Sequence, residues 1–137
     1  MEGKGRITGH TGLLALIGSP VGHSGSPAMY NYSFEKLGLD YAYVAFDIKV
    51  EEVKAALDAM RLFHMRGCNV TMPCKTEAAK YMDELSPAAR IIGAVNTIVN
   101  EDGKLIGHMT DGEGFVGNLR DHGIEIKGKK ITVAGGG

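Results

Sequence analysis

The chain has 137 residues, of which 44% are apolar and 23% charged, as expected of a water-soluble globular protein. Its 15 basic and 16 acidic residues leave a net charge of -1, which argues against a nucleic acid or a membrane surface as partner. No apolar run is long enough to cross a bilayer, and the first residues lack the order of a signal peptide. The two cysteines, Cys68 and Cys74, match neither a redox pair nor a zinc site, so we expect reduced thiols, a cytoplasmic protein and no metal.

The first predicted strand is the apolar run 13–17, and the segment after it contains two serines. Ser24 and Ser26 flank a glycine, and Pro27 opens a predicted helix that ends at Gly38. Ser26 is interpreted either as the N-cap of this helix or as a hydroxyl that binds an anion at its N-terminus. Ser24 has no predicted capping role, so the pair favours an anion site.

Two further strands are predicted over residues 41–46 and 67–71, with an amphipathic helix over residues 51–64 between them. Val53, Leu57 and Met60 form the apolar stripe of that helix, and Phe63 extends it. The order strand–helix–strand–helix–strand predicts a mainly parallel sheet.

Polar side chains gather at the end of the third strand. Asn69 and Thr71 are two residues apart and therefore lie on one face of it. Pro73 ends the strand, so Lys75 lies just beyond its carboxyl end, where open α/β sheets bind ligands. Amide and hydroxyl groups beside an ammonium suit a small polyhydroxylated acid. The alternative is an ordinary strand end with a solvated lysine.

The next segment predicts a short helix from Lys75 to Met82, a second one opened by Ser86-Pro87, and a hairpin. Its strands are residues 93–100 and 104–108. Asn96 is an amide in an otherwise apolar strand, and burying it unpaired would cost ~1–3 kcal/mol. We therefore expect either backbone or a ligand to bind it.

The last part of the chain contains another helix and a glycine-rich end. Asp111 is a candidate cap for a helix that ends at Gly123. Residues 131–134 predict a buried strand that runs into Gly135, Gly136 and Gly137. A strand followed by glycines opens a dinucleotide-binding fold, but a third fingerprint glycine and the following helix are missing. We therefore expect the chain to be a fragment that stops inside such a fold.

Four motifs together resemble the N-terminal half of the shikimate dehydrogenases, including quinate/shikimate dehydrogenases. They are His23-Ser-Gly-Ser-Pro27, Gly67-Cys-Asn-Val-Thr-Met-Pro-Cys-Lys75, Gly93-Ala-Val-Asn-Thr97 and Thr110-Asp-Gly-Glu-Gly114. The resemblance implies an α/β fold of three layers, with a mostly parallel twisted sheet and helices on both faces. It also implies a substrate-binding domain over residues 1–112. Residues 113–137 would then be a connecting helix and the first strand and glycine turn of an incomplete dinucleotide-binding domain.

The resemblance also implies roles for particular residues. It makes Lys75 and Asp111 the catalytic pair, and it assigns substrate binding to both of them and to Ser24, Ser26, Asn69, Thr71 and Asn96. Within this set the two serines would hold the substrate carboxylate, Thr71 and Asn96 would bind ring hydroxyls, and Asn69 would support the site. Gly135 and Gly137 would belong to an incomplete cofactor motif. Two departures are Met109, where the family usually has Asn, and Gly136, where it usually has Ala.

The activity implied is the reversible NADP-dependent reduction of 3-dehydroshikimate to shikimate, in the biosynthesis of chorismate and the aromatic amino acids. The fragment alone should be inactive, because most cofactor-binding residues are absent from it. A lysine ammonium can donate the proton that a nascent alkoxide needs, and a neighbouring carboxylate favours its charged form. The alternatives are a quinate/shikimate dehydrogenase that uses NAD or NADP, and a non-catalytic sensor of shikimate or quinate. The chain is expected to be a monomer or a homodimer.

Overall fold

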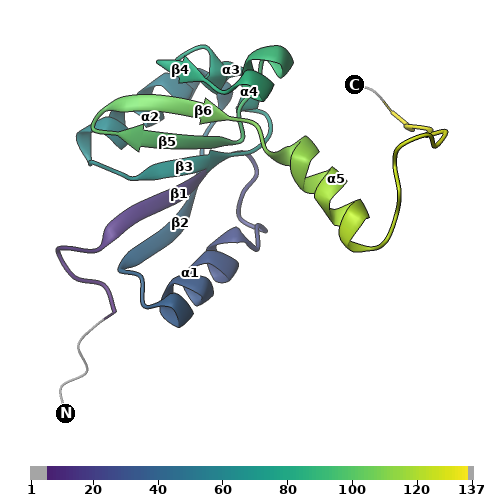
Figure 1. Cartoon of the computed structure of the whole chain (residues 1–137). Coiled ribbons are helices and arrows are strands. Elements are labelled where there is room, and N and C mark those ends of the chain that lie inside the picture. Colours follow the sequence, from purple (N-terminus) through teal and green to yellow (C-terminus); the bar gives the residue numbers. More distant parts are fainter. Residues whose placement is uncertain (1–5, 136–137) are drawn as a thin grey trace.

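The computed structural model describes residues 6–135. Strands and helices alternate over most of the chain, and a hairpin and a final helix follow them (Figure 1). In chain order the elements are β1 (Gly12–Gly18), α1 (Ser26–Leu37), β2 (Tyr41–Asp47), the 3-10 turn η1 (Val50–Glu52), α2 (Val53–Leu62), β3 (Gly67–Val70), α3 (Lys75–Ala79), β4 (Glu84–Leu85), α4 (Pro87–Ile92), β5 (Thr97–Glu101), β6 (Lys104–His108) and α5 (Asp111–Asp121).

The strands form one six-stranded sheet in the order β2-β1-β3-β5-β6-β4. Strand β1 pairs in parallel with both β2 and β3, and β4 pairs in parallel with β6. The hairpin strand β5 is antiparallel to both of its neighbours, β3 and β6. The predicted α/β fold is confirmed, and its sheet is mixed. The two-residue edge strand β4 was not predicted, because so short a pairing leaves no periodic pattern.

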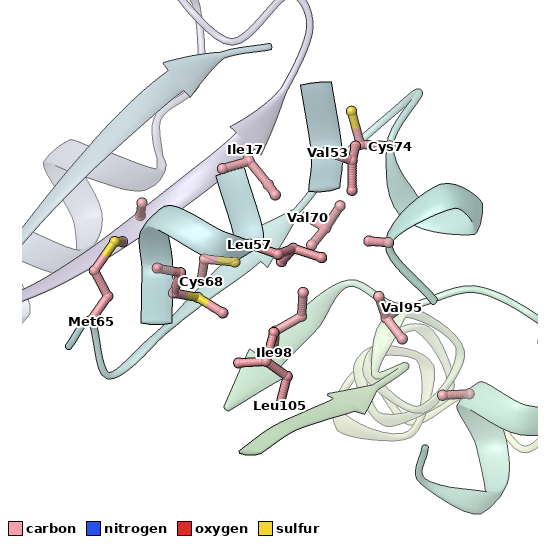
Figure 2. Close-up of a cluster of buried hydrophobic side chains, with 14 residues drawn as sticks. Ile17, Val53, Leu57, Met65, Cys68, Val70, Cys74, Val95, Ile98 and Leu105 are labelled. Atoms are coloured by element: carbon pink, nitrogen blue, oxygen red, sulfur yellow. The ribbon is translucent and has the colours of Figure 1, made fainter. Parts of the chain in front are cut away.

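One face of the sheet is covered by α2 and carries the larger apolar core. Every second residue of a strand points to the same face, so Ala15 and Ile17 of β1 lie on this side. The helix contributes the predicted stripe Val53, Leu57 and Met60, all buried. Figure 2 shows Val53 and Leu57 beside side chains of the strands, and Met60 belongs to the same cluster.

The opposite face is covered by α1 over β1 and β2, and its core is smaller and aromatic (Figure 1). Leu16 points to this side, together with Phe34 of α1 and Tyr43 of β2. The ring of Tyr30 stacks on that of Tyr43 at a centroid distance of 4.5 Å. The predicted helices on both faces are therefore present.

Strand directions bring several chain segments to one edge of the sheet, the one formed by the carboxyl ends of β1, β3 and β6. The parallel strands β1 and β3 both end there. Because β5 is antiparallel to β3 and pairs Thr97 with Asn69, β5 begins at this edge, and β6 ends there. Gly18 closes β1 with φ +152, and a Cβ on it would lie 2.4 Å from the Thr71 side chain. That close approach joins the end of β1 to the loop after β3.

Several predicted element boundaries are wrong. The strand predicted from residue 93 begins only at Thr97, and the helix predicted from residue 51 opens with the separate turn η1. Phe63, predicted to extend the α2 stripe, follows the helix and is 66% exposed. The short helix α3 ends at Ala79 rather than Met82.

The predicted strand over residues 131–134 is also wrong. These residues have no regular structure, and both Ile131 and Val133 are exposed. A strand is stable only when a neighbouring strand satisfies its backbone groups, and no described strand pairs with this segment. Helix α5 leads the chain away from the sheet, and residues 131–134 come after this helix (Figure 1). None of the helices in the described range is both long and apolar enough to cross a lipid bilayer.

Candidate active site

The loop between β1 and α1 carries the two serines at the edge where β1 ends. Helix α1 has Gly25 as its N-cap, and no side chain caps it. The Ser26 backbone N–H donates instead to Ser24 Oγ at 3.2 Å. Of the two interpretations of Ser26, the N-cap is therefore wrong, and it is the Ser24 hydroxyl that accepts a bond at the start of the helix. The Ser26 hydroxyl has no capping bond and remains a candidate for contact with an anion.

Lys75 is the first residue of α3, directly beyond the end of β3. Its side chain is 22% exposed, and its Nζ forms an ion pair with Asp111 Oδ2. Asp111 is the first residue of α5 and follows β6, so strands from different parts of the sheet bring the two groups together. The N-cap position that the sequence suggested for Asp111 is occupied by Thr110.

Asn96 binds the second oxygen of the same carboxylate. Its Nδ2 donates to Asp111 Oδ1 at 2.7 Å and to Thr110 Oγ1 at 2.9 Å. The Thr110 backbone N–H in turn donates to Asn96 Oδ1 at 3.0 Å. The amide of Asn96 is thus bound by the loop that leads into α5, and it ties this loop to the beginning of β5.

Asn69 lies on the face of β3 that carries the aromatic core. Its Oδ1 accepts a hydrogen bond from the Tyr43 hydroxyl at 2.8 Å. Its Nδ2 donates to Thr97 Oγ1 at 3.2 Å and to the Asn96 carbonyl at 3.4 Å. Sequence reasoning missed Tyr43 and Thr97, and their signal was alternation: each faces the same side of the sheet as Asn69.

The charges of the site are set by the ion pair. The hydrogen bond from Lys75 is the largest influence on Asp111 and lowers the pKa of its carboxyl, against the opposing effect of burial. The Coulomb attraction of Lys75 and the hydrogen bond from Asn96 act in the same direction. Asp111 is therefore a carboxylate near neutral pH, and an ammonium lies against it.

The structure brings some predicted residues into contact and leaves others apart. Lys75, Asp111, Asn96 and Asn69 belong to one bonded cluster, whereas no hydrogen bond in residues 6–135 joins Ser24, Ser26 or the Thr71 side chain to it. Those three still lie at the same sheet edge, because β1 and β3 end there.

Two further sequence expectations concern the cofactor glycines and Met109. Gly135 follows an irregular segment, and Gly137 lies outside the described residues. The described residues after α5 therefore form no strand–glycine–helix cradle for a dinucleotide. Met109 packs against the larger apolar core and does not supply the polar group that the family's usual Asn would provide.

An apolar hollow of about 370 Å³ lies elsewhere, between α2 and the sheet. Its wall includes Phe46, Met60 and Phe63, and Asp47 is a charged residue beside it. Its apolar lining offers no set of groups for acid–base chemistry, so the polar edge remains the candidate site. Within the described part of the chain, no group of three or more His, Cys, Asp or Glu residues could hold a metal ion.

The fold and this edge define an α/β domain whose loops present an ammonium–carboxylate pair, carboxamides and hydroxyls at one edge of a mixed sheet. The model of the shikimate dehydrogenase substrate binding domain matches residues 16–98, and the chain belongs to this family. The family resemblance drawn from the four motifs is thereby confirmed.

Relatives with names and known structures agree with this assignment. The chain is 53% identical over 132 residues to the shikimate dehydrogenase (NADP(+)) of Listeria monocytogenes serotype 4b, covering 96% of this chain and 45% of that protein. A crystal structure of shikimate 5-dehydrogenase from L. monocytogenes, in complex with shikimate and NAD, superposes with a TM-score of 0.87 at 53% identity. The superposition covers 90% of this chain and 43% of the L. monocytogenes chain.

The enzyme from Thermus thermophilus, crystallised in complex with shikimate, gives a TM-score of 0.82 at 41% identity over 87% of this chain and 46% of that one. The chain thus spans about half the length of the relatives it matches.

Proposed function

We propose that this chain is the substrate-binding part of a shikimate dehydrogenase, which reversibly reduces 3-dehydroshikimate to shikimate with NADP. The observation that carries the proposal is the Lys75–Asp111 ion pair, held at the sheet edge with Asn96 on the second carboxylate oxygen. Family membership and the names of the relatives support the substrate and the cofactor.

The pair suits the proton transfer of such a reaction. Reducing a ring ketone places negative charge on its oxygen, and the Lys75 ammonium can stabilise that charge and donate the proton. Asp111 forms the ion pair with Lys75 and, with Asn96, offers hydrogen-bonding groups to a ring hydroxyl. Ser24 and Ser26, on the loop before α1, are assigned to the substrate carboxylate, which the N-terminus of that helix also favours. Thr71 is assigned to a ring hydroxyl.

Hydride transfer has no residues assigned to it here, since the described chain forms no dinucleotide cradle. In the proposed organisation residues 1–112 form the substrate-binding domain, and α5 leads on from it. The same proposal has an alternative form, in which the enzyme uses NAD or NADP and also accepts quinate as a substrate.

Titration calorimetry of this chain with shikimate is the first test, with quinate titrated in parallel. We expect saturable binding of shikimate, and loss of that binding in a Ser24→Ala/Ser26→Ala double variant. Absence of any heat of binding with the folded parent chain would contradict the assignment of the site.

The second test measures catalysis in the longest open reading frame that contains this chain, with NADP and NAD compared. Lys75→Ala should lower turnover by about 10²–10⁴-fold, the usual contribution of a general acid, with a much smaller effect on KM. Lys80→Ala is the matched control, because Lys80 is paired with Glu77 on the same segment. Near-normal turnover in Lys75→Ala would defeat the role of Lys75. If the parent protein binds shikimate but does not oxidise it with either cofactor, the non-catalytic sensor of shikimate or quinate would be favoured.

A further inference from the structure

A continuous path of side-chain hydrogen bonds runs from the aromatic core to the charge pair. It starts at the Tyr43 hydroxyl, which lies 2.8 Å from Asn69 Oδ1. Asn69 Nδ2 lies 3.2 Å from Thr97 Oγ1, and Thr97 Oγ1 lies 3.2 Å from Asn96 Oδ1. Asn96 Nδ2 then reaches Asp111 Oδ1 at 2.7 Å. The path crosses from β2 through β3 and β5 to the start of α5.

The chemistry of its last member gives this path a single direction. The carboxylate of Asp111 can only accept, so Asn96 must turn its NH₂ toward it and its oxygen toward Thr97. The Thr97 hydroxyl then donates to Asn96 and accepts from Asn69. Asn69 therefore presents its NH₂ to Thr97 and its oxygen to Tyr43, and every bond of the path has its donor on the Tyr43 side.

Tyr43 is well suited to begin such a path. Tyr43 is only 3% exposed, and its ring stacks on that of Tyr30. The Asn31 carboxamide binds the Tyr43 backbone on both sides, donating to its carbonyl at 2.7 Å and accepting from its N–H at 2.9 Å. Burial raises the pKa of the Tyr43 hydroxyl, which therefore remains a donor over the whole neutral and alkaline range in which enzymes are assayed.

We propose that Tyr43 and Thr97 are positioning residues of the active site. The Thr97 hydroxyl acts directly on the Asn96 carboxamide that binds Asp111, and the Tyr43 hydroxyl acts on it through Asn69 and Thr97; together they set its orientation. The description of this edge as an active site rests on the proposed function; the positioning itself does not. The backbone N–H and the hydroxyl of Thr110 also bond to the Asn96 carboxamide, so the path supplies only one of several constraints on it. Its removal should loosen Asn96 without releasing it.

Nuclear magnetic resonance of the side-chain amides of this chain tests the positioning without any ligand. Tyr43→Phe should shift the NH₂ signals of Asn69 and, two bonds further along the path, those of Asn96. Tyr81→Phe is the matched control, because Tyr81 donates to Glu77 away from the path. It should leave both amides unchanged. A folded Tyr43→Phe variant with parent-like Asn96 signals would overturn the proposal.

Thr97 distinguishes a relay from a general loosening of the core. Thr97→Val keeps the shape and removes the hydroxyl, so in this background Tyr43→Phe should affect the Asn96 side-chain amide far less, because only the 3.4 Å bond from Asn69 to the Asn96 backbone carbonyl still joins the two residues. Thr97→Ser restores the hydroxyl and should restore that effect. An unchanged response of Asn96 to Tyr43→Phe in both backgrounds would also overturn the proposal. If Tyr43→Phe does not fold, Thr97→Val alone decides, since it must shift the Asn69 amide signals whereas Thr97→Ser must not.

Shikimate titration connects the path to the site. Tyr43→Phe and Thr97→Val should each weaken binding by about threefold to tenfold, the equivalent of one net hydrogen bond. Together they should weaken it no more than either one alone. If the parent binds no shikimate but the amide signals respond as expected, the proposed function fails and the positioning stands. Additive losses of affinity would show that the two hydroxyls act separately.

Discussion

Strand β3 has two faces with opposite chemistry. Cys68 and Val70 point into the larger apolar core under α2, and each is buried. Asn69, between them, points to the other side and is bonded to Tyr43 and Thr97. One face of the strand is therefore stabilised by removing apolar surface from water, and the other by hydrogen bonds with fixed directions.

The difference between the two faces of β3 indicates where this fold can tolerate amino-acid substitutions. An apolar contact has no preferred direction, so the core depends on volume and shape, and moderate repacking preserves it. A buried polar group requires its particular partner, since an unpaired one carries a penalty. We therefore expect variants on the α2 face to change stability and variants on the Asn69 face to change ligand binding. The following predictions test that separation.

The largest expected loss of stability is in Leu57→Ala, on the apolar side. Leu57 is 1% exposed at the centre of the cluster in Figure 2, and truncating it leaves a cavity. The free energy of unfolding should fall by about 2–5 kcal/mol. Leu62→Ala, on the same helix but at a leucine that is 71% exposed, should change it by less than about 0.5 kcal/mol.

Denaturant unfolding followed by circular dichroism measures both values. Shikimate binding by the folded fraction of Leu57→Ala should match the parent. A loss of affinity as large as the loss of stability would show that the two faces are not separable.

A smaller effect is expected of Gly67→Ala, in β3 two residues before Asn69. A Cβ on Gly67 would stand 2.2 Å from the Ile98 backbone carbonyl oxygen, so β5 would have to move away from β3. Unfolding free energy should fall by about 1–3 kcal/mol, as for other overpacked sites. Since the same displacement separates Asn69 from Thr97, this variant should lose stability and shikimate affinity together.

Gly9→Ala is the control for this substitution, because a Cβ there meets nothing within 4 Å. It should leave both the unfolding curve and the calorimetric titration unchanged. A Gly67→Ala chain with full affinity would mean that the spacing of β3 and β5 does not determine the geometry of the site.

The sequence predicted the apolar side of the molecule well. The helical stripe Val53, Leu57 and Met60 and the continuous apolar run of β1 are signals to which several residues contribute. The exact ends of the helices were harder to predict, since a single hydrogen bond decides each one. At the start of α1, for example, the hydroxyl that accepts a backbone hydrogen bond is that of Ser24 and not that of Ser26. The strand predicted over residues 131–134 failed for a related reason, because local propensity does not provide a pairing partner.

The candidate site divides in the same way. Lys75 could be predicted at this edge because it follows the end of β3. Its pairing with Asp111 came from the family resemblance, because the residues alone predicted Asp111 only as a helix cap. Tyr43 and Thr97 were missed, because alternation within a strand shows which residues share a face but not which of them meet Asn69. Their polar contacts appear only once the register pairs Asn69 with Thr97. Pairing between distant strands is the information that a single sequence lacks.

The smallest expected effect on stability concerns the exposed end of the polar face, the Lys75–Asp111 pair. The pKa of the Asp111 carboxyl is lowered chiefly by its hydrogen bond with Lys75. A carboxyl whose pKa is lower in the folded than in the unfolded chain stabilises the fold above the unfolded value, and this contribution is lost as pH falls through the folded value. Because the Asp111 side chain is 54% exposed, the contribution should not exceed about 1 kcal/mol.

Carboxyl carbon resonances followed during an acid titration measure this directly. Lys75→Ala should raise the pKa of Asp111 toward its ordinary value, and Asn96→Ala should raise it less, because the lysine provides the larger influence. Lys54→Ala is the matched control: Lys54 lowers the pKa of Asp58 on α2, so this variant should move Asp58 and leave Asp111 unchanged. If Asp111 titrates at the same pH with and without Lys75, the two charges are not paired in solution. The polar face would then lack the ammonium–carboxylate couple that separates its chemistry from that of an ordinary hydrogen-bonded strand end.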